Sequence, residues 1–99
     1  MAKFQVIGET RYSKEELTTV IVEHLRSRLS EVKQQISDLE KTIDDLERRY
    51  GVGWEAFRER FGRGELGEEA DLDYVEWHAA VELLGELCKE RDMLTEVLS

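Results

Sequence analysis

The sequence is poor in residues that interrupt helices. Its 99 residues include no proline and seven glycines, of which five fall between Gly51 and Gly67. Because proline and glycine are the commonest helix breakers, the rest of the chain can form long uninterrupted helices. Cysteine is also scarce: Cys88 stands alone, which excludes an intramolecular disulfide and a cysteine-rich zinc site. We interpret Cys88 as a small buried hydrophobic residue on a helix face.

Long hydrophobic runs are missing as well. The longest, residues 20–22 and 79–81, are three residues each. A membrane-spanning helix requires roughly 20 apolar residues, and a secretory signal requires an apolar stretch of about 7–15. The sequence therefore favours a cytoplasmic protein with no membrane segment, and its length favours a single domain over residues 1–99.

Acidic residues outnumber basic ones, and the excess is confined to the C-terminal two-thirds. The formal net charge is −9; residues 1–33 carry six basic and five acidic side chains, whereas residues 34–99 carry eight and eighteen. Such an acidic surface repels phosphate and favours a basic partner protein. Nucleic acid could be contacted only through the N-terminal third, although a solvated face is the favoured interpretation of its basic residues, Arg11, Lys14, Arg26, Arg28 and Lys33.

The most regular pattern is an apolar stripe whose spacing alternates between four and three residues. Ser13 and Glu16 precede it and fit a capping box, which marks the start of a helix. We predict one helix over residues 13–50, whose stripe forms a coiled-coil seam. The seam residues of this helix are Leu25, Leu29, Val32, Ile36, Leu39, Ile43, Leu46 and Tyr50.

The second half of the chain predicts a turn and a return limb. Glycines at residues 51 and 53 end the first helix, and aromatic residues spaced by three and four predict a short helix over residues 54–61. A glycine-rich acidic loop is expected at residues 62–70. A last helix is expected over residues 71–98, and its apolar residues continue the seam spacing, with Leu84, Leu87 and Leu94 among them.

These elements predict an all-α protein: a long antiparallel helical hairpin, similar to a coiled coil, with a short helix at the turn. At 1.5 Å per residue the outgoing helix spans roughly 57 Å and the two returning helices together roughly 54 Å, so the limbs match in length. A hairpin buries one stripe per helix, and that burial alone does not offset the ordering of the chain. We therefore expect a homo-oligomer or a partner.

The first residues form a separate element. Residues 3–7 are rich in aromatic and β-branched side chains and are followed by Gly8, which predicts a short strand or extended arm within residues 1–12. A lone strand is not stable. The arm must pair with a second copy or with the sheet edge of a partner, or else be disordered in the free protein.

No motif in the sequence supports catalysis or cofactor binding. Residues 62–67 match the pattern G-x-G-x-x-G, but a helix rather than a strand precedes them, and the neighbouring acidic side chains would repel a phosphate. His24 and His78 lie on different predicted helices, and the five serines imply no Ser-His-Asp arrangement. We predict a protein that is not an enzyme and that uses no metal or cofactor.

Five of the eight aromatic side chains cluster near the acidic loop. One interpretation is a small core that holds the end of the hairpin together. The other is a partner surface, in which aromatic anchors ringed by acidic groups meet a basic target. The residues concerned are Trp54, Phe57, Phe61, Tyr74 and Trp77.

Part of the C-terminal half resembles small prokaryotic antitoxins. The matching residues are 46–51, 54–57, 60–67 and 71–77. In that family a heptad helix leads to a tyrosine-glycine turn, a short aromatic helix, a glycine-glutamate-leucine-glycine loop and an acidic helix start with tryptophan. Here residues 53–54, glycine and tryptophan, replace the small polar pair usual after the turn. The resemblance implies the protein half of a type II toxin–antitoxin module, which neutralises a small ribonuclease-like toxin.

Three functions are therefore considered. The first is an antitoxin-like interaction protein that covers a basic toxin surface and excludes RNA from it. The second is a self-assembling structural coiled coil, and the third is a dimeric nucleic-acid-binding regulator that uses the N-terminal third. For the first function, the candidate contact residues are Phe4, Val6, Ile7, Glu65, Glu68, Glu69, Asp73, Glu76 and Trp77.

Overall fold

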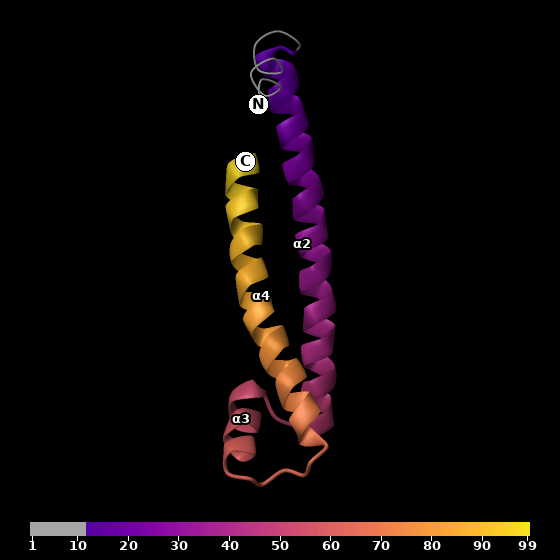
Figure 1. Ribbon diagram of the computed structural model, residues 1–99, viewed down its shortest axis with the longest axis vertical. Helices are drawn as coiled ribbons and strands as arrows, with labels where there is room; N and C mark the ends of the chain where they lie inside the picture. The colour runs from indigo at the N-terminus through magenta and orange to yellow at the C-terminus, as the bar shows by residue number, and fades with distance from the viewer. Residues whose placement is uncertain (1–11) are drawn as a thin grey trace, which may run out of the picture.

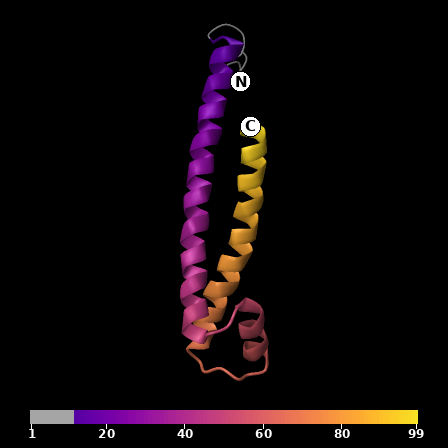
Figure 2. The same cartoon turned by 180° about the vertical axis from the view of Figure 1, so that it is seen from behind.

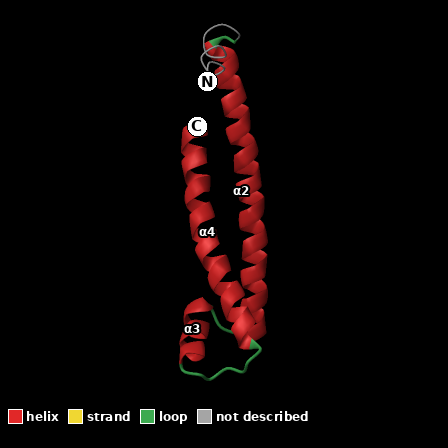
Figure 3. Ribbon diagram, in the orientation of Figure 1, coloured by secondary structure: helices red, strands yellow, loops and turns green. Residues whose placement is uncertain are grey.

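Two long helices form the body of the protein. The computed structural model describes residues 12–99, and within that range it contains three α-helices and no strand: α2 (Lys14–Tyr50), α3 (Trp54–Gly62) and α4 (Ala70–Leu98). Figures 1 and 2 show α2 and α4 side by side and running in opposite directions, with α3 at the end where the chain turns back. Figure 3 shows loops only between these helices and at the chain ends. The predicted all-α helical hairpin is confirmed, whereas its N-terminal arm lies outside the described residues except for Tyr12.

Helix α2 has well-defined signals at both ends. The backbone N–H of Glu16 donates to Oγ of Ser13 at 3.0 Å, and the backbone N–H of Ser13 donates to Oε1 of Glu16 at 3.1 Å. This is the predicted capping box. At the other end Gly51 adopts φ 69°, and its N–H donates to the carbonyl of Glu47 at 2.7 Å. Glycine reaches this left-handed conformation at little cost, so the helix ends there.

The return limb is divided by the glycine-rich loop. Helix α3 begins after Gly53 and ends one residue later than expected, and α4 begins one residue earlier than expected. Asp71 and Asp73 lie in the first turn of α4, where carboxylates interact favourably with the helix dipole. Gly64, at φ 72°, turns the chain between the two helices.

The core consists of two clusters along the interface between α2 and α4. The middle cluster is built on Val32, Ile36 and Leu87, with Leu84 and Cys88 packed against it. These positions of the predicted seam are buried or half-buried between the two helices, and Cys88 is a half-buried packing residue. The second cluster lies at the closed end of the hairpin, where the chain turns.

The closed-end cluster is mainly aromatic. Phe57 and Trp77 have no exposed surface, and their ring centroids lie 4.7 Å apart. Tyr50 packs on Phe57 at 4.6 Å, and Phe61 stacks on Tyr74 at 4.3 Å. Of the two interpretations of the aromatic residues, the small core that holds the end of the hairpin together is the one that their burial supports. Leu46 and Ala70 complete the buried part of this cluster.

The two limbs differ in length at the open end, where α2 begins and α4 ends. Arg28 of α2 is paired with Glu90 of α4 through hydrogen bonds of 2.7 and 2.8 Å. Leu98, the last residue of α4, lies eight residues beyond Glu90, and Val20 lies eight residues before Arg28. In this antiparallel register α4 therefore ends about level with Val20, and the start of α2 extends past it, as Figures 1 and 2 show.

Candidate partner-binding surface

Helix α4 carries an apolar stripe that no other part of residues 12–99 covers. Leu72, Val75 and Leu83 are 80%, 65% and 44% exposed, and Ala79 is also exposed. Spacings of three and four residues place these four side chains on one face of the helix. We refer to Leu72, Val75, Ala79 and Leu83 as the α4 stripe.

The α4 stripe lies away from α3. Tyr74 faces α3, since its ring stacks on Phe61 and lies 5.2 Å from that of Trp54. At 3.6 residues per turn, Leu72 and Tyr74 point about 200° apart around the α4 axis. Helix α4 is therefore apolar in three directions, of which α2 covers one and α3 another. An apolar helix face is normally covered by a neighbour, so the exposed third face is a candidate binding surface.

A shallow groove runs between the stripe and α2. Its walls are Leu39 and Thr42 from α2 and Glu76, Ala79, Ala80 and Leu83 from α4. The groove is mainly apolar, and Glu76 places a carboxylate at its edge. The stripe and the groove together form one continuous surface on the side of the hairpin away from α3.

The charged side chains that the loop and α4 place around this surface have one sign. Residues 65–86 contain eight acidic side chains and no lysine or arginine. Glu68, Glu69, Asp71 and Glu76 are all exposed beside the start of the stripe. An apolar surface with a ring of carboxylates disfavours phosphate and attracts cationic groups.

Asp73 differs from the other acids because the fold holds it. The phenol of Tyr50 donates to Oδ2 of Asp73 at 2.5 Å, and Nη1 of Arg49 donates to Oδ1 at 2.8 Å. The hydrogen bond from Tyr50, followed by that from Arg49, lowers the pKa of Asp73 below its ordinary value. Burial, and then the hydrogen bond to Asp73, raises the pKa of Tyr50 to about 12.

Some of the contact residues predicted from the sequence are exposed in the structure, and others are buried or already hydrogen-bonded. Glu68, Glu69 and Glu76 lie exposed beside the α4 stripe. Glu65 is exposed but accepts a 2.6 Å hydrogen bond from Arg63. Asp73 is occupied by its two donors, and Trp77, with no exposed surface, offers a partner nothing in this conformation. Phe4, Val6 and Ile7 lie outside the described residues.

The apolar part of the surface was not predicted from the sequence. Leu72, Val75 and Leu83 were not among the predicted contact residues, because the seam spacing lies on another face of the last helix. A second signal was present: Leu72, Ala79 and Leu83 are spaced by seven and four residues, and none of them belongs to the seam. Two apolar faces on one helix indicate two neighbours.

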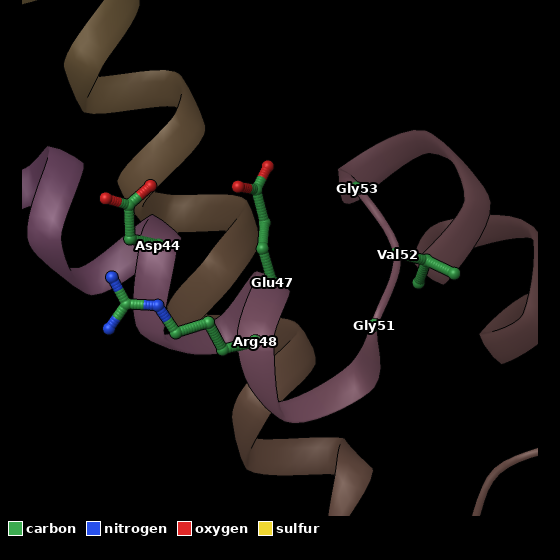
Figure 4. Close-up of a pocket in the computed structure, with 6 residues that line it drawn as sticks. All are labelled: Asp44, Glu47, Arg48, Gly51, Val52 and Gly53. Atoms are coloured by element: carbon green, nitrogen blue, oxygen red, sulfur yellow. The ribbon is translucent and has the colours of Figure 1, made fainter.

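A second depression lies in the turn between α2 and α3. It is lined by Asp44, Glu47, Arg48 and residues 51–53. Figure 4 shows the three charged side chains projecting from the last turns of α2 beside the glycine-containing turn. Arg48 forms a 3.8 Å ion pair with Asp45 on the same helix, and the depression is open to solvent. Among its six lining residues there is no histidine, cysteine or serine, so we assign it no chemistry.

Residues 12–99 contain no group of three or more histidine, cysteine, aspartate or glutamate side chains that could hold a metal ion. Within the same residues, no helix is both long enough and apolar enough to cross a membrane.

The chain matches no protein-family model, no curated protein and no solved structure.

Proposed function

We propose that the protein is a non-enzymatic interaction module that binds a basic partner protein through the α4 stripe. The observation that carries this proposal is the exposure of Leu72, Val75 and Leu83 within a segment, residues 65–86, that has eight acidic side chains and no lysine or arginine. Apolar contact supplies affinity in protein interfaces, and charges at the rim select the partner and speed its approach.

The shape of the surface suggests what the partner presents. The stripe follows the axis of α4 over residues 72–83, and the mainly apolar groove lies beside it. An amphipathic helix can lie along such a surface, with its apolar residues against Leu72 and Leu83 and its lysine or arginine residues beside Glu68 and Glu76. A nucleic acid would meet carboxylates over the whole of this surface, which disfavours it as the ligand.

The resemblance to antitoxins makes the proposal more specific. We propose that the basic partner is a small ribonuclease-like toxin, and that the acidic helix neutralises it by covering its RNA-binding surface. Two features support a toxin as the partner: the antitoxin-like motif of residues 46–77 and the acidic side chains around the stripe. Occlusion and charge competition would then both prevent RNA from binding.

The proposal can be tested with two matched double variants. The stripe variant carries Leu72→Ser and Val75→Ser, and the control carries Val20→Ser and Ile21→Ser, which removes exposed apolar side chains of similar size at the other end of the hairpin. All four side chains are exposed, so both variants should keep the helical circular dichroism of the parent. The binding probe is the purified product of the reading frame next to this gene in its source.

The expected result is specific binding that the stripe variant lowers at least tenfold and the control leaves unchanged. Raising the salt concentration should slow association, since the charges of the rim are screened. For the antitoxin role, the bound protein should also lose its ribonuclease activity. A neighbouring product that is acidic, or binding that the stripe variant leaves unchanged, contradicts the proposal. Binding without loss of ribonuclease activity would support the module but contradict the antitoxin role.

A further inference from the structure

The open end of the hairpin carries a second exposed apolar surface. Tyr12, Leu17, Val20 and Ile21 are 50%, 36%, 64% and 58% exposed, and together with Glu16 they line a mainly apolar hollow. Spacings of three and four residues place Leu17, Val20 and Ile21 on neighbouring positions of α2. We refer to Tyr12, Leu17, Val20 and Ile21 as the α2 tip.

Helix α4 leaves the α2 tip exposed and reaches only part of it. Helix α4 ends about level with Val20, so no residue of α4 lies opposite Leu17. The end of α4 adds to the exposed apolar surface, since Met93 and Val97 are 66% and 67% exposed. Further along the hairpin, from Val32 onward, the same side of α2 is covered.

The two ends of the hairpin differ sharply in charge. Residues 12–30 carry three basic and three acidic side chains. Residues 34–88, which include the closed end and the α4 stripe, carry six basic and fifteen acidic ones. The α2 tip, with near-neutral surroundings, and the α4 stripe, with acidic surroundings, therefore suit partners of different kinds.

Charge balance at the tip favours a second copy of the chain. In a two-fold symmetric dimer each patch meets the same patch of the other copy. A surface of one charge sign therefore meets a surface of the same sign. A strongly acidic surface opposes such a contact. A surface with equal numbers of both signs permits it, because Lys14 of one copy can approach Glu15 or Glu16 of the other.

We infer that the α2 tip is a homodimer contact in which Leu17, Val20 and Ile21 of two copies pack against each other. The two hairpins meet at their open ends, and their closed ends point apart. Each dimer then presents two α4 stripes, both free for a basic partner. This inference does not rest on the proposed function, because the two surfaces lie at opposite ends of the hairpin.

The same two double variants separate this inference from the proposed function. Sedimentation velocity of the full chain over a range of concentrations should give a dimer, twice the 11.6 kDa of one chain. The variant with Val20→Ser and Ile21→Ser should weaken dimerisation at least tenfold, whereas the variant with Leu72→Ser and Val75→Ser should leave it unchanged. Circular dichroism checks that both variants remain helical. If the stripe variant dimerises normally but binds no basic partner, the two surfaces are independent.

Cross-linking locates the contact directly. Cys88→Ser removes the native thiol, and Val20→Cys in that background should form a disulfide-linked dimer on mild oxidation, because the two tips pack together. Val75→Cys is the matched control and should not cross-link. A chain that stays monomeric at all concentrations overturns the inference, and so does cross-linking of Val75→Cys alone. If the chain is monomeric and the change at Val20 and Ile21 lowers the free energy of unfolding, residues 1–11 of the same chain cover the tip, which also overturns it.

Discussion

The phenol of Tyr50 donates a 2.5 Å hydrogen bond to Asp73, which follows it by 23 residues in the chain. Tyr50 is the last residue of α2, and Asp73 lies in the first turn of α4. The contact therefore ties the end of one long helix to the start of the other across the intervening turn, α3 and loop. It lies at the edge of the aromatic cluster, where the Tyr50 ring packs on Phe57.

Replacing Tyr50 by phenylalanine should lower the free energy of unfolding by about 1–2 kcal/mol, since the ring packing is kept and a hydrogen bond to a carboxylate is lost. Urea unfolding at neutral pH measures the change. The matched control is Tyr74→Phe, because the hydroxyl of Tyr74 makes no hydrogen bond to residues 12–99. If both variants lower the free energy of unfolding equally, the hydrogen bond to Asp73 does not stabilise the fold.

Alkaline pH should weaken the fold through the same residue. Burial raises the pKa of Tyr50 from 10.0 to about 12, which means that the folded state favours the neutral phenol. This contribution is fully present below pH 10 and is lost as the pH rises through 12. An ultraviolet difference titration between the parent and Tyr50→Phe should show a tyrosine that ionises near 12. A midpoint for this tyrosine near 10 would contradict the prediction.

Acid should weaken the fold through Asp73 and Glu90. Hydrogen bonds from Tyr50 and Arg28, respectively, lower the pKa values of these two carboxyls below their ordinary values of 3.8 and 4.5. Their contribution to stability is present above those ordinary values and is lost as the pH falls through the lowered ones. Asp73→Asn and Glu90→Gln should each flatten the acid limb of a stability–pH curve, whereas Glu40→Gln, on the exposed side of α2, should leave it as it is.

Replacing Trp77 by alanine or by phenylalanine should have very different effects on the free energy of unfolding. Trp77→Ala leaves a cavity in the aromatic cluster and should lower the free energy of unfolding by about 3–5 kcal/mol. The indole Nε1 is buried and has no hydrogen-bond partner among residues 12–99. Trp77→Phe removes this unsatisfied donor and keeps an aromatic ring. It should therefore lower the free energy of unfolding by less than about 2 kcal/mol. A loss from Trp77→Phe as large as that from Trp77→Ala would show that the donor does not weaken the fold.

Two glycines should respond to alanine in opposite directions. Gly51 has φ 69° and ends α2, so Gly51→Ala should lower the free energy of unfolding by about 1 kcal/mol through backbone strain alone. Gly85 lies inside α4, and a Cβ built on it meets nothing within 4 Å. Gly85→Ala should therefore raise the free energy of unfolding by about 0.5–1 kcal/mol. Thermal unfolding of the two variants side by side tests the contrast.

The sequence alone determined the helical hairpin. The capping box at Ser13, the four-three spacing from Leu25 to Tyr50 and the glycine after Tyr50 are local signals. Each acts within a few residues, through backbone hydrogen bonds, side-chain periodicity or the left-handed conformation of glycine. Such signals specify where a helix begins and ends and which of its residues share a face.

Only the tertiary structure decided which of those faces is covered. Trp77, a predicted contact residue, is fully buried beneath α3, whereas Leu72, five residues earlier on the same helix, is left in solvent. Nor could the sequence pattern place Tyr50 against Asp73 or leave the α2 tip exposed. These outcomes depend on where α3 packs and on the register between two long helices, and both are set by contacts between residues far apart in the chain.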